Sequence, residues 1–333
     1  MANSSIVNGV NMANIKTIST ADVAVDWETI YEVDLTAQGT SATANTDWPR
    51  NLTGSNGEIV SWTVGNNTKA DEMKLISGTG MRIVIDGTSR DSGNWYAATQ
   101  NSPVIYAPID NIYSAAGLTY DLNETFAFQT LHEFTINTAG AANRYFYGGS
   151  MILDGITGDP ATGTSAGNWM QSTWLTQGST TETANQWLFR NGSMQQAGGS
   201  GNQYWLTGSI SDADRPTFCE IVFYPGAAWS SCAGVLSKFP TPLTTQANDI
   251  YAHGSMANQL PLDMGTSDTT SGTPNTTANP GQTTQFLMRP GTTTSQGRQI
   301  NVGVSAAYWT SGDARDGKVT CLWKKLRVLR RGT

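Results

Sequence analysis

Alternating apolar and polar residues run through most of this chain, whereas the apolar spacing of amphipathic helices is nearly absent. The alternating runs are bounded by Gly, Asn, Asp and Pro, which end strands and begin turns. This pattern predicts an all-β protein, built as a two-sheet antiparallel β-sandwich or jelly roll. We expect strands at residues 25–35, 58–64, 81–86, 104–107, 125–137, 145–153, 169–176, 186–190, 204–207, 217–224, 299–306 and 319–329.

Residues 125–137 show the alternation most clearly. One face of this predicted strand carries Phe126, Phe128, Thr130, His132, Phe134 and Ile136. Such an aromatic face needs a second layer to cover it. The run 218–224 is apolar on both faces except at Glu220, which predicts a central strand with Cys219 as a small buried residue.

Long polar segments interrupt the strands near residues 154–168, 191–202 and 264–299, where Thr, Ser, Gly, Asn and Pro are abundant. Segments of this composition are flexible linkers or extended arms that a partner orders. The weakly patterned residues 1–22 are interpreted as an N-terminal arm. No internal repeat or sharp linker divides the remainder, so we expect one large β-sandwich domain over residues 23–333.

Charged residues make up only 14% of the 333 residues, against about 25% in an average globular protein. No apolar run approaches the roughly 20 residues of a membrane span, so we expect no membrane insertion. The first 17 residues lack the basic and apolar regions of a signal peptide. The three cysteines, Cys219, Cys232 and Cys321, are odd in number and far apart, which predicts a reduced folding compartment.

The net charge of −7 is unevenly distributed, because residues 318–333 hold six of the 19 basic residues and no acidic ones. The acidic remainder makes nucleic acid an improbable partner, since phosphate binding needs a broad basic face. Two interpretations of the basic end stay open. It is either a solvated last strand whose charges discourage edge pairing, or a surface that docks on an acidic neighbour. The interface candidates in it are Lys324, Lys325, Arg327 and Arg330.

An E-V-D run at residues 32–34 matches the opening of the E-x-D-x-E pattern that many retaining glycosidases carry on one strand of a sandwich. Thr36 or Ala37 stands where the last carboxylate would be. Glu28 lies four strand residues from Glu32, at about 13 Å, whereas a retaining pair is ~5–5.5 Å apart. We therefore expect a solvent-facing acidic row without a glycosidase pair.

Sandwich-type polysaccharide lyases use a Gln and a His two residues apart on one strand face, with Arg and Tyr from neighbouring strands. Gln129 and His132 are three residues apart and so point to opposite faces. We interpret His132 as a buried, hydrogen-bonded residue of the aromatic face. A groove-lining His132 stays open as the alternative, and Arg144, Tyr145 and Tyr147 would then complete a glycan-binding or lyase-like site.

The remaining catalytic and metal-binding motifs lack the context that their chemistry needs. The G-T-S-A-G run at residues 163–167 fits G-x-S-x-G, but no predicted strand precedes it and no helix follows. His132 and His253 have no zinc-ligand spacing. Oxygen-rich turns at 121–124 and 212–214 could hold Ca²⁺, although backbone capping by Asp and Asn explains them. We expect no catalytic residue, no metal and no cofactor.

Four tryptophans are concentrated in the loop-rich middle of the chain: Trp169, Trp174, Trp187 and Trp205. Buried aromatic residues fill a sandwich core, while exposed ones anchor subunit interfaces or stack on sugar rings. All three roles stay open, and we carry these tryptophans forward as interface candidates.

The whole chain resembles virion proteins of tailed bacteriophages, namely capsid decoration and fibre-type proteins built on β-sandwiches. The resemblance rests on short strands, loops rich in Thr, Ser, Gly and Asn, unpaired cysteines and scarce charge. In addition, the K-L-R-V-L-R ending at residues 325–330 is similar to the last strand of concanavalin-like sandwiches. The resemblance implies a jelly-roll or concanavalin-like fold and a non-enzymatic structural protein, assembled in the host cytoplasm and exposed on the virion.

The same resemblance implies partners. Proteins of this kind contact copies of themselves, with a trimer as the expected homo-oligomer, and other virion proteins. The alternative comes from a different functional class: a glycan-binding receptor-recognition module, or a polysaccharide lyase-like enzyme, whose partner would be a host surface glycan.

Overall fold

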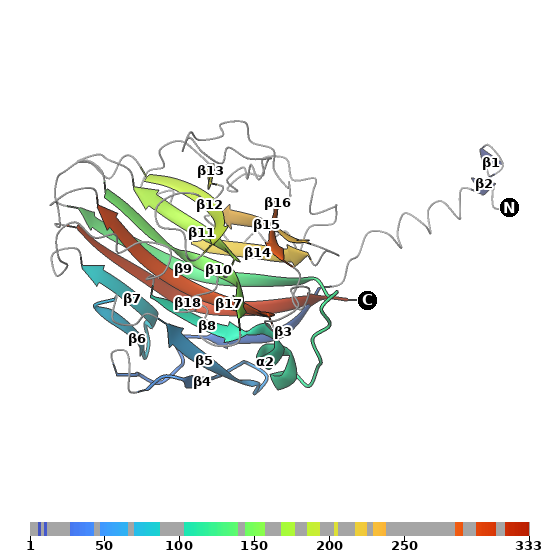
Figure 1. Cartoon of the computed structure of the whole chain (residues 1–333). Helices are drawn as coiled ribbons and strands as arrows, with labels where there is room; N and C mark the ends of the chain where they lie inside the picture. Colours follow the sequence, from blue (N-terminus) through green and yellow to red (C-terminus); the bar gives the residue numbers. More distant parts are fainter. Residues whose placement is uncertain are drawn as a thin grey trace.

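Two large antiparallel sheets, each of eight strands within the described residues, make up the sandwich (Figure 1). The computed structural model describes residues 6–7, 10–11, 27–42, 47–65, 70–86, 103–138, 144–156, 168–176, 185–193, 203–205, 217–224, 229–237, 284–288, 298–310 and 317–332. Within these residues strands dominate and every strand pair is antiparallel. The prediction of an all-β, two-sheet antiparallel sandwich is therefore confirmed.

The first sheet, called the β10 sheet here, has the order β13 (Gln203–Trp205), β12 (Asn185–Ser193), β11 (Asn168–Thr176), β10 (Arg144–Ile156), β17 (Arg298–Thr310), β8 (Val104–Pro108), β5 (Ile59–Gly65) and β4 (Arg50–Thr53). The second, called the β18 sheet, has the order β16 (Thr284–Met288), β15 (Trp229–Ser237), β14 (Phe218–Tyr224), β9 (Phe126–Thr138), β18 (Gly317–Arg331), β7 (Gly80–Asp86) and β6 (Glu72–Ile76). In the β18 sheet, β3 (Trp27–Asp34) also pairs with β18. The other described elements are a two-stranded sheet of β1 (Ile6–Val7) and β2 (Val10–Asn11), and the helix α2 (Ile109–Ala115).

Each of the predicted strands overlaps an observed one, because their period of two is a local signal. The elements not predicted from the sequence are β1, β2, β4, β6, β15, β16 and α2. Helix α2 has only seven residues, which is too short to show a helical period. Strand β16 lies inside the predicted polar segment 264–299, and the ends of the segments 154–168 and 191–202 belong to β10, β11 and β12. Residues 298–299 begin β17, and the rest of those three segments lies outside the described residues.

The core lies between the two sheets and takes the aromatic face of β9. Phe126 and Phe128 are fully buried, and the ring of Phe126 stacks on Phe223 of β14 with centroids 5.0 Å apart. The β10 sheet contributes apolar residues such as Val302 from the opposite side. Strand β14 lies between β9 and β15 with Cys219 fully buried, as predicted. Each large side chain buried in this way stabilises the fold by about 1.5–3 kcal/mol.

Strand β18 runs through the middle of its sheet, where it appears red beside β9 in Figure 1. It pairs with β9 along most of its length, with β7 through residues 318–323 and with β3 through residues 325–331. The interpretation of this segment as a strand whose charges discourage edge pairing is therefore wrong. Apolar Leu326 and Val328 alternate with its charged residues and are fully buried in the core, as are Cys321 and Trp323.

We expect deletion of residues 318–333 to abolish folding. The deletion removes the partner of three strands and leaves β9, β7 and β3 with unpaired edges. The measurement is the cooperative thermal transition by circular dichroism. Deletion of residues 1–22, whose described residues form the small β1–β2 sheet outside the sandwich, is the control and should keep the transition. A cooperative transition in the chain lacking residues 318–333 would contradict this assignment.

We expect the thiols of Cys219 and Cys321 to stay unmodified in the native protein. Both are fully buried, and burial raises the pKa of Cys321, so reactive thiolate is scarce. In a Cys232→Ser background, a thiol reagent should label the folded chain only as fast as the chain unfolds. The prediction would be refuted if the reagent labelled the folded chain as fast as it labels the chain unfolded in urea.

Candidate functional site

A row of polar side chains crosses the outer face of the β18 sheet, the face turned away from the β10 sheet. Glu220 of β14 is paired with Gln129 of β9, Gln129 with Arg327 of β18, and Arg327 with Glu32 of β3. Directly paired residues share one face of a sheet. Four strands from distant parts of the sequence thus bring their polar residues into one line.

A β-bulge in β18 gives this face two consecutive lysines. The register between β18 and β9 shifts between Trp323 and Lys325, so Lys324 is the extra residue. Trp323 points into the core, while both Lys324 and Lys325 bind carboxylates of the outer face. Beside the bulge, Gly80 of β7 has φ +127°, and a Cβ there would overlap the carbonyl oxygen of Trp323. The close approach of β7 and β18 therefore requires glycine at this position.

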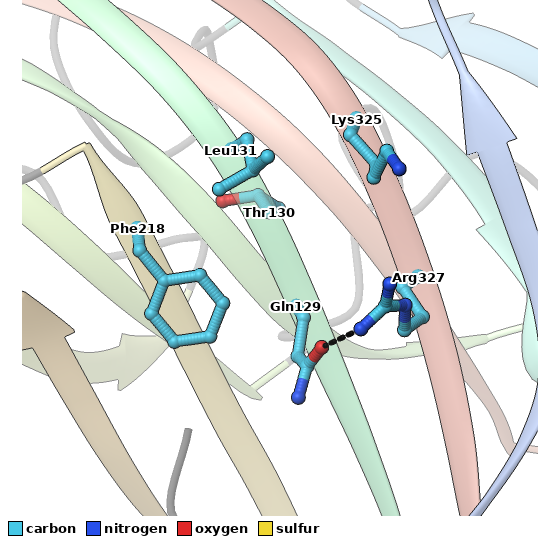
Figure 2. A pocket seen from close by; sticks show the side chains of 6 residues that line it. All are labelled: Gln129, Thr130, Leu131, Phe218, Lys325 and Arg327. Carbon is cyan, nitrogen blue, oxygen red and sulfur yellow. Dashed lines mark hydrogen bonds between the residues drawn. The ribbon is translucent and has the colours of Figure 1, made fainter. Parts of the chain in front are cut away.

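A pocket of about 130 Å³ lies over β9 on the same face (Figure 2). Gln129 and Leu131 lie in its middle, with Phe218 of β14 on one side and Lys325 and Arg327 of β18 on the other. The remaining lining residue is Thr130, whose hydroxyl is 2.7 Å from Ser150 of the opposite sheet. The pocket thus has an apolar side and a hydrogen-bonding side.

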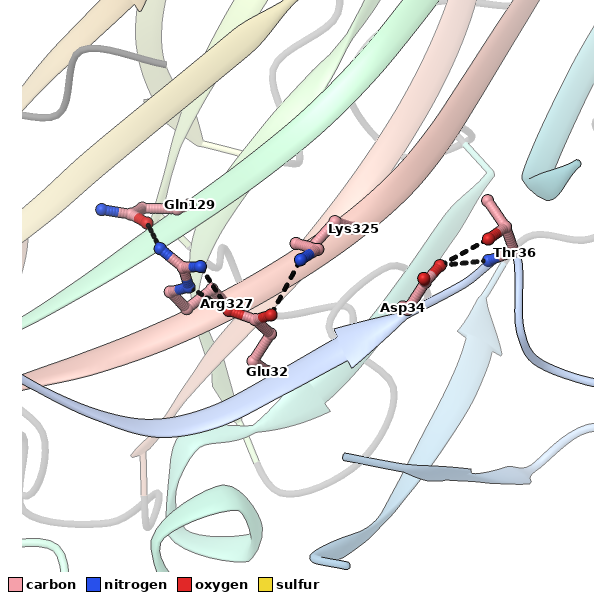
Figure 3. A network of polar contacts seen from close by, with 6 residues as sticks. All are labelled: Glu32, Asp34, Thr36, Gln129, Lys325 and Arg327. Atoms are coloured by element: carbon pink, nitrogen blue, oxygen red, sulfur yellow. Dashed lines mark hydrogen bonds and ion pairs between the residues drawn. The ribbon is translucent and has the colours of Figure 1, made fainter. Parts of the chain in front are cut away.

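Hydrogen bonds and ion pairs connect the polar groups of this face (Figure 3). Lys325 Nζ donates to Glu32 Oε1 at 2.8 Å, and Arg327 Nε donates to Glu32 Oε2 at 2.5 Å. Arg327 Nη1 also donates to Gln129 Oε1 at 3.3 Å. The amide Nε2 of Gln129 donates to Glu220 at 2.5 Å, and Glu220 is fully buried. Each cation of the row is therefore bound to a carboxylate.

The carboxyl groups of β3 are held in their charged form. Burial alone would raise the pKa of Glu32, but hydrogen bonds from Lys325 and Arg327 and their positive charges lower it overall. A hydrogen bond from the hydroxyl of Thr36 lowers the pKa of Asp34. Both pKa values are lowered, so the carboxyl groups of Glu32 and Asp34 are anionic at neutral pH.

The described carboxylates do not form a glycosidase pair. Glu32 and Glu220 are three strand spacings apart, about 14 Å, whereas retaining pairs need ~5–5.5 Å and inverting pairs ~6.5–9.5 Å. Glu32 and Asp34 are closer, but the general acid of such a pair needs a raised pKa, and both of these are lowered. Glu28 binds Arg330 instead. The predicted acidic row is thus paired with cations of β18.

His132 lies in the interior and does not border the pocket. It is 1% exposed, its ring stacks on Phe134 with centroids 4.3 Å apart, and its Nδ1 is 3.2 Å from the hydroxyl of Thr130. Gln129 points to the outer face, so the two residues lie on opposite faces of β9, as their spacing predicted. The Gln and His of a lyase-like set are therefore not brought together here.

The other predicted glycan-binding residues, Arg144, Tyr145 and Tyr147, lie in β10, which belongs to the sheet opposite to that of His132. The four predicted interface tryptophans also lie in the β10 sheet. Trp169 and Trp174 are in β11, Trp187 is in β12 and is the register partner of Trp174, and Trp205 is in β13. The side chains of all these residues lie outside the described part of the structure, so their roles stay predictions.

The four predicted interface cations of β18 have partners within the chain. Lys324 binds Glu133 and Arg330 binds Glu28, while Lys325 and Arg327 bind Glu32. They remain partly exposed, at 31–42% of the side-chain surface. Their charge is therefore used at least in part to hold β18 against its neighbours.

No group of three or more His, Cys, Asp or Glu side chains is arranged for a metal ion within the described residues. In the turn at 121–124, Asp121 Oδ1 accepts a hydrogen bond from the backbone N–H of Asn123 at 2.8 Å, which is the capping role expected from the sequence. The turn at 212–214 and the G-x-S-x-G run at 163–167 lie outside the described residues. Among the described helices, none has the length and apolar character to cross a bilayer.

Comparison with known proteins finds no matching family model and no matching curated protein. Three solved structures are similar over most of the chain. A CBM2 module of the evolved Dit of Lactobacillus casei BL23 phage J-1 has a TM-score of 0.35 at 10% identity, over 92% of this chain and 97% of that chain. A family 7 alginate lyase has a TM-score of 0.33 at 10% identity, over 93% and 96%. The κ-carrageenase of Pseudoalteromonas carrageenovora has a TM-score of 0.36 at 7% identity, over 92% and 96%. All three scores are below 0.5, so the fold assignment rests on the strand pairing of this chain itself.

We expect Glu32→Gln to destabilise the protein by about 1–2 kcal/mol at pH 7, because Lys325 and Arg327 lose their shared anion. The lowered pKa of Glu32 means that its contribution is complete above the unfolded value of about 4.3 and is lost as the pH falls through the folded value. Urea unfolding between pH 7 and pH 3 should therefore show a smaller loss of stability in the variant.

The control is Glu133→Gln, which removes a single exposed ion pair with Lys324 and should cost about 0.5 kcal/mol or less. Equal effects of the two substitutions would contradict the assignment of Glu32 as the shared anion of the row.

Proposed function

We propose that the chain is a non-enzymatic structural component of a tailed-bacteriophage particle, a capsid decoration or fibre-type protein. In this proposal it assembles in the host bacterial cytoplasm, is exposed on the virion, and acts through contacts with copies of itself and with other virion proteins. The resemblance of the whole sequence to such virion proteins supports the particle assignment. The site geometry supports the non-enzymatic part.

The main observation in support of this proposal is that the candidate catalytic groups are engaged in contacts that stabilise the β-sandwich. Glu32 binds two cations of β18, and Glu220 accepts from Gln129. His132 is stacked and hydrogen-bonded between the sheets. A general acid or base needs a proton-accessible group with a pKa near the working pH. The lowered pKa of Glu32 and the burial of His132 both depart from that requirement.

A second candidate function, a glycan-binding recognition module, is favoured by one observation. The pocket over β9 combines the apolar Phe218 and Leu131 with the guanidinium of Arg327 and the amide of Gln129. Pockets for small molecules typically join apolar walls to a few fixed polar groups in this way. A module of this kind is compatible with a place on the particle surface.

We expect the purified chain to form one discrete oligomer, a trimer, that persists on dilution. Size-exclusion chromatography with light scattering measures this. A stable monomer would count against the virion-component proposal and in favour of an independent glycan-binding domain. In parallel, incubation with a panel of polysaccharides should release no oligosaccharides, and specific release of products would contradict the non-enzymatic assignment.

Attachment to the particle is tested with the chain that lacks residues 1–22, because loss of residues 318–333 removes the central strand instead of a docking segment. If the N-terminal arm docks the protein, particles assembled with the truncated chain should have reduced occupancy. Full occupancy would assign docking to the sandwich.

A further inference from the structure

We propose that the pocket over β9 binds one ring of an uncharged sugar. The inference rests on the glycan-binding candidate above and specifies its site and the class of its ligand. The ring would lie across β9, with its C–H face against Phe218 and Leu131 and its hydroxyl groups towards Arg327 and Lys325 (Figure 2). Strands β14 and β18 are two spacings apart, about 10 Å, which leaves room for a single ring between them.

Hydrogen-bonding capacity supports a ligand rich in hydroxyl groups. A guanidinium has five N–H donors and an ammonium has three. Arg327 directs three contacts to Glu32 and Gln129, and Lys325 directs one to Glu32. Both side chains therefore keep donors beyond the ones that hold them in place. These donors are next to an apolar wall, so a ligand must present polar edges and an apolar face together.

Charge favours an uncharged ligand over an acidic one. The two cations of the pocket share Glu32, and Asp34 is the register partner of Lys325. The lowered pKa values of Glu32 and Asp34 keep both carboxyl groups anionic. Two carboxylates thus balance two cations, so the site offers no excess positive charge to a uronic acid or a sulfated sugar.

The neighbours of Arg327 also hold it in place before any ligand binds. Glu32 fixes one side of the guanidinium and Gln129 fixes the other (Figure 3). The amide of Gln129 in turn donates to Glu220. Side chains ordered in advance lose less conformational entropy when a ligand binds. The row therefore presents a rigid hydrogen-bonding edge.

Saturation-transfer NMR on the full chain tests the proposal, with glucose, galactose, mannose and N-acetylglucosamine as probes and with glucuronate and galacturonate as acidic counterparts. We expect at least one uncharged sugar to bind with millimolar affinity and the acidic sugars to bind no more tightly. Saturation transfer to none of the uncharged sugars, or binding of a uronate more than about tenfold tighter, would overturn the proposal.

Two variants locate the site. Arg327→Lys keeps the charge for Glu32 but loses the planar contact with Gln129, and we expect affinity to fall about tenfold or more. The matched control is Arg330→Lys on the same strand, paired with Glu28 outside the pocket, which should leave affinity within about twofold. Equal losses in both variants would overturn the assignment.

Leu131→Trp fills the pocket without removing a polar group and should abolish binding, while Leu122→Trp, at an exposed turn, should not. Retained binding in a folded Leu131→Trp chain would also refute the site. Thermal unfolding confirms that each variant is folded. Because these outcomes do not depend on oligomeric state, failure of the sugar site leaves the virion proposal to be decided by light scattering.

Discussion

The pairing of β18 with β9 on one side and with β3 and β7 on the other is the constraint on which the rest of the structure depends. Its contacts are among the most distant that the sequence allows: Arg327 and Glu32 are 295 residues apart. Bringing such segments together carries a loop-closure cost that must be offset by many contacts at once. The buried apolar face of β18, with Trp323 and Val328, supplies the hydrophobic part of that offset, and its charged face supplies the ion pairs. Because β3 begins at residue 27 and β18 ends at residue 331, the β18 sheet is complete only when both of these distant segments are available.

The polar row on the outer face follows from the same constraint. Placing Arg327 in a central strand brings its charge beside two other strands, where an unpaired cation would be costly. Glu32 and Gln129 satisfy it from either side, and Gln129 in turn satisfies the buried Glu220. This chain of partners explains why Glu32, which opens the run that resembles a catalytic motif in the sequence, has a lowered pKa and structural partners. The pKa of Asp34 is lowered by its hydrogen bond from Thr36. Carboxylates engaged in this way stabilise the sheet above their titration range and are poor proton donors.

The parts of the fold that could be predicted from sequence were those with a local signal. The period of two located the longer strands and separated the faces of β9, so the burial of Phe128 and His132 was expected. Strand order and register are non-local, and for that reason the central place of β18 was missed. The bulge did leave a local trace, because Trp323 and Leu326 are three residues apart and interrupt the alternation. The pocket has no local signal in the sequence, because Gln129 and Arg327 are 198 residues apart and are brought together only by strand pairing.

A stabilising role and a binding role of this face are compatible on physical grounds. The contacts that neutralise Arg327 also fix the direction of its remaining donors, and the same holds for Lys325 beside Glu32. A binding edge assembled from flexible, unpaired lysines would lose its conformational freedom at the moment of binding. In this structure the side chains of Arg327 and Lys325 already lose most of that conformational freedom when the chain folds. The network that holds the central strand β18 therefore also holds the donors that line the proposed pocket in position.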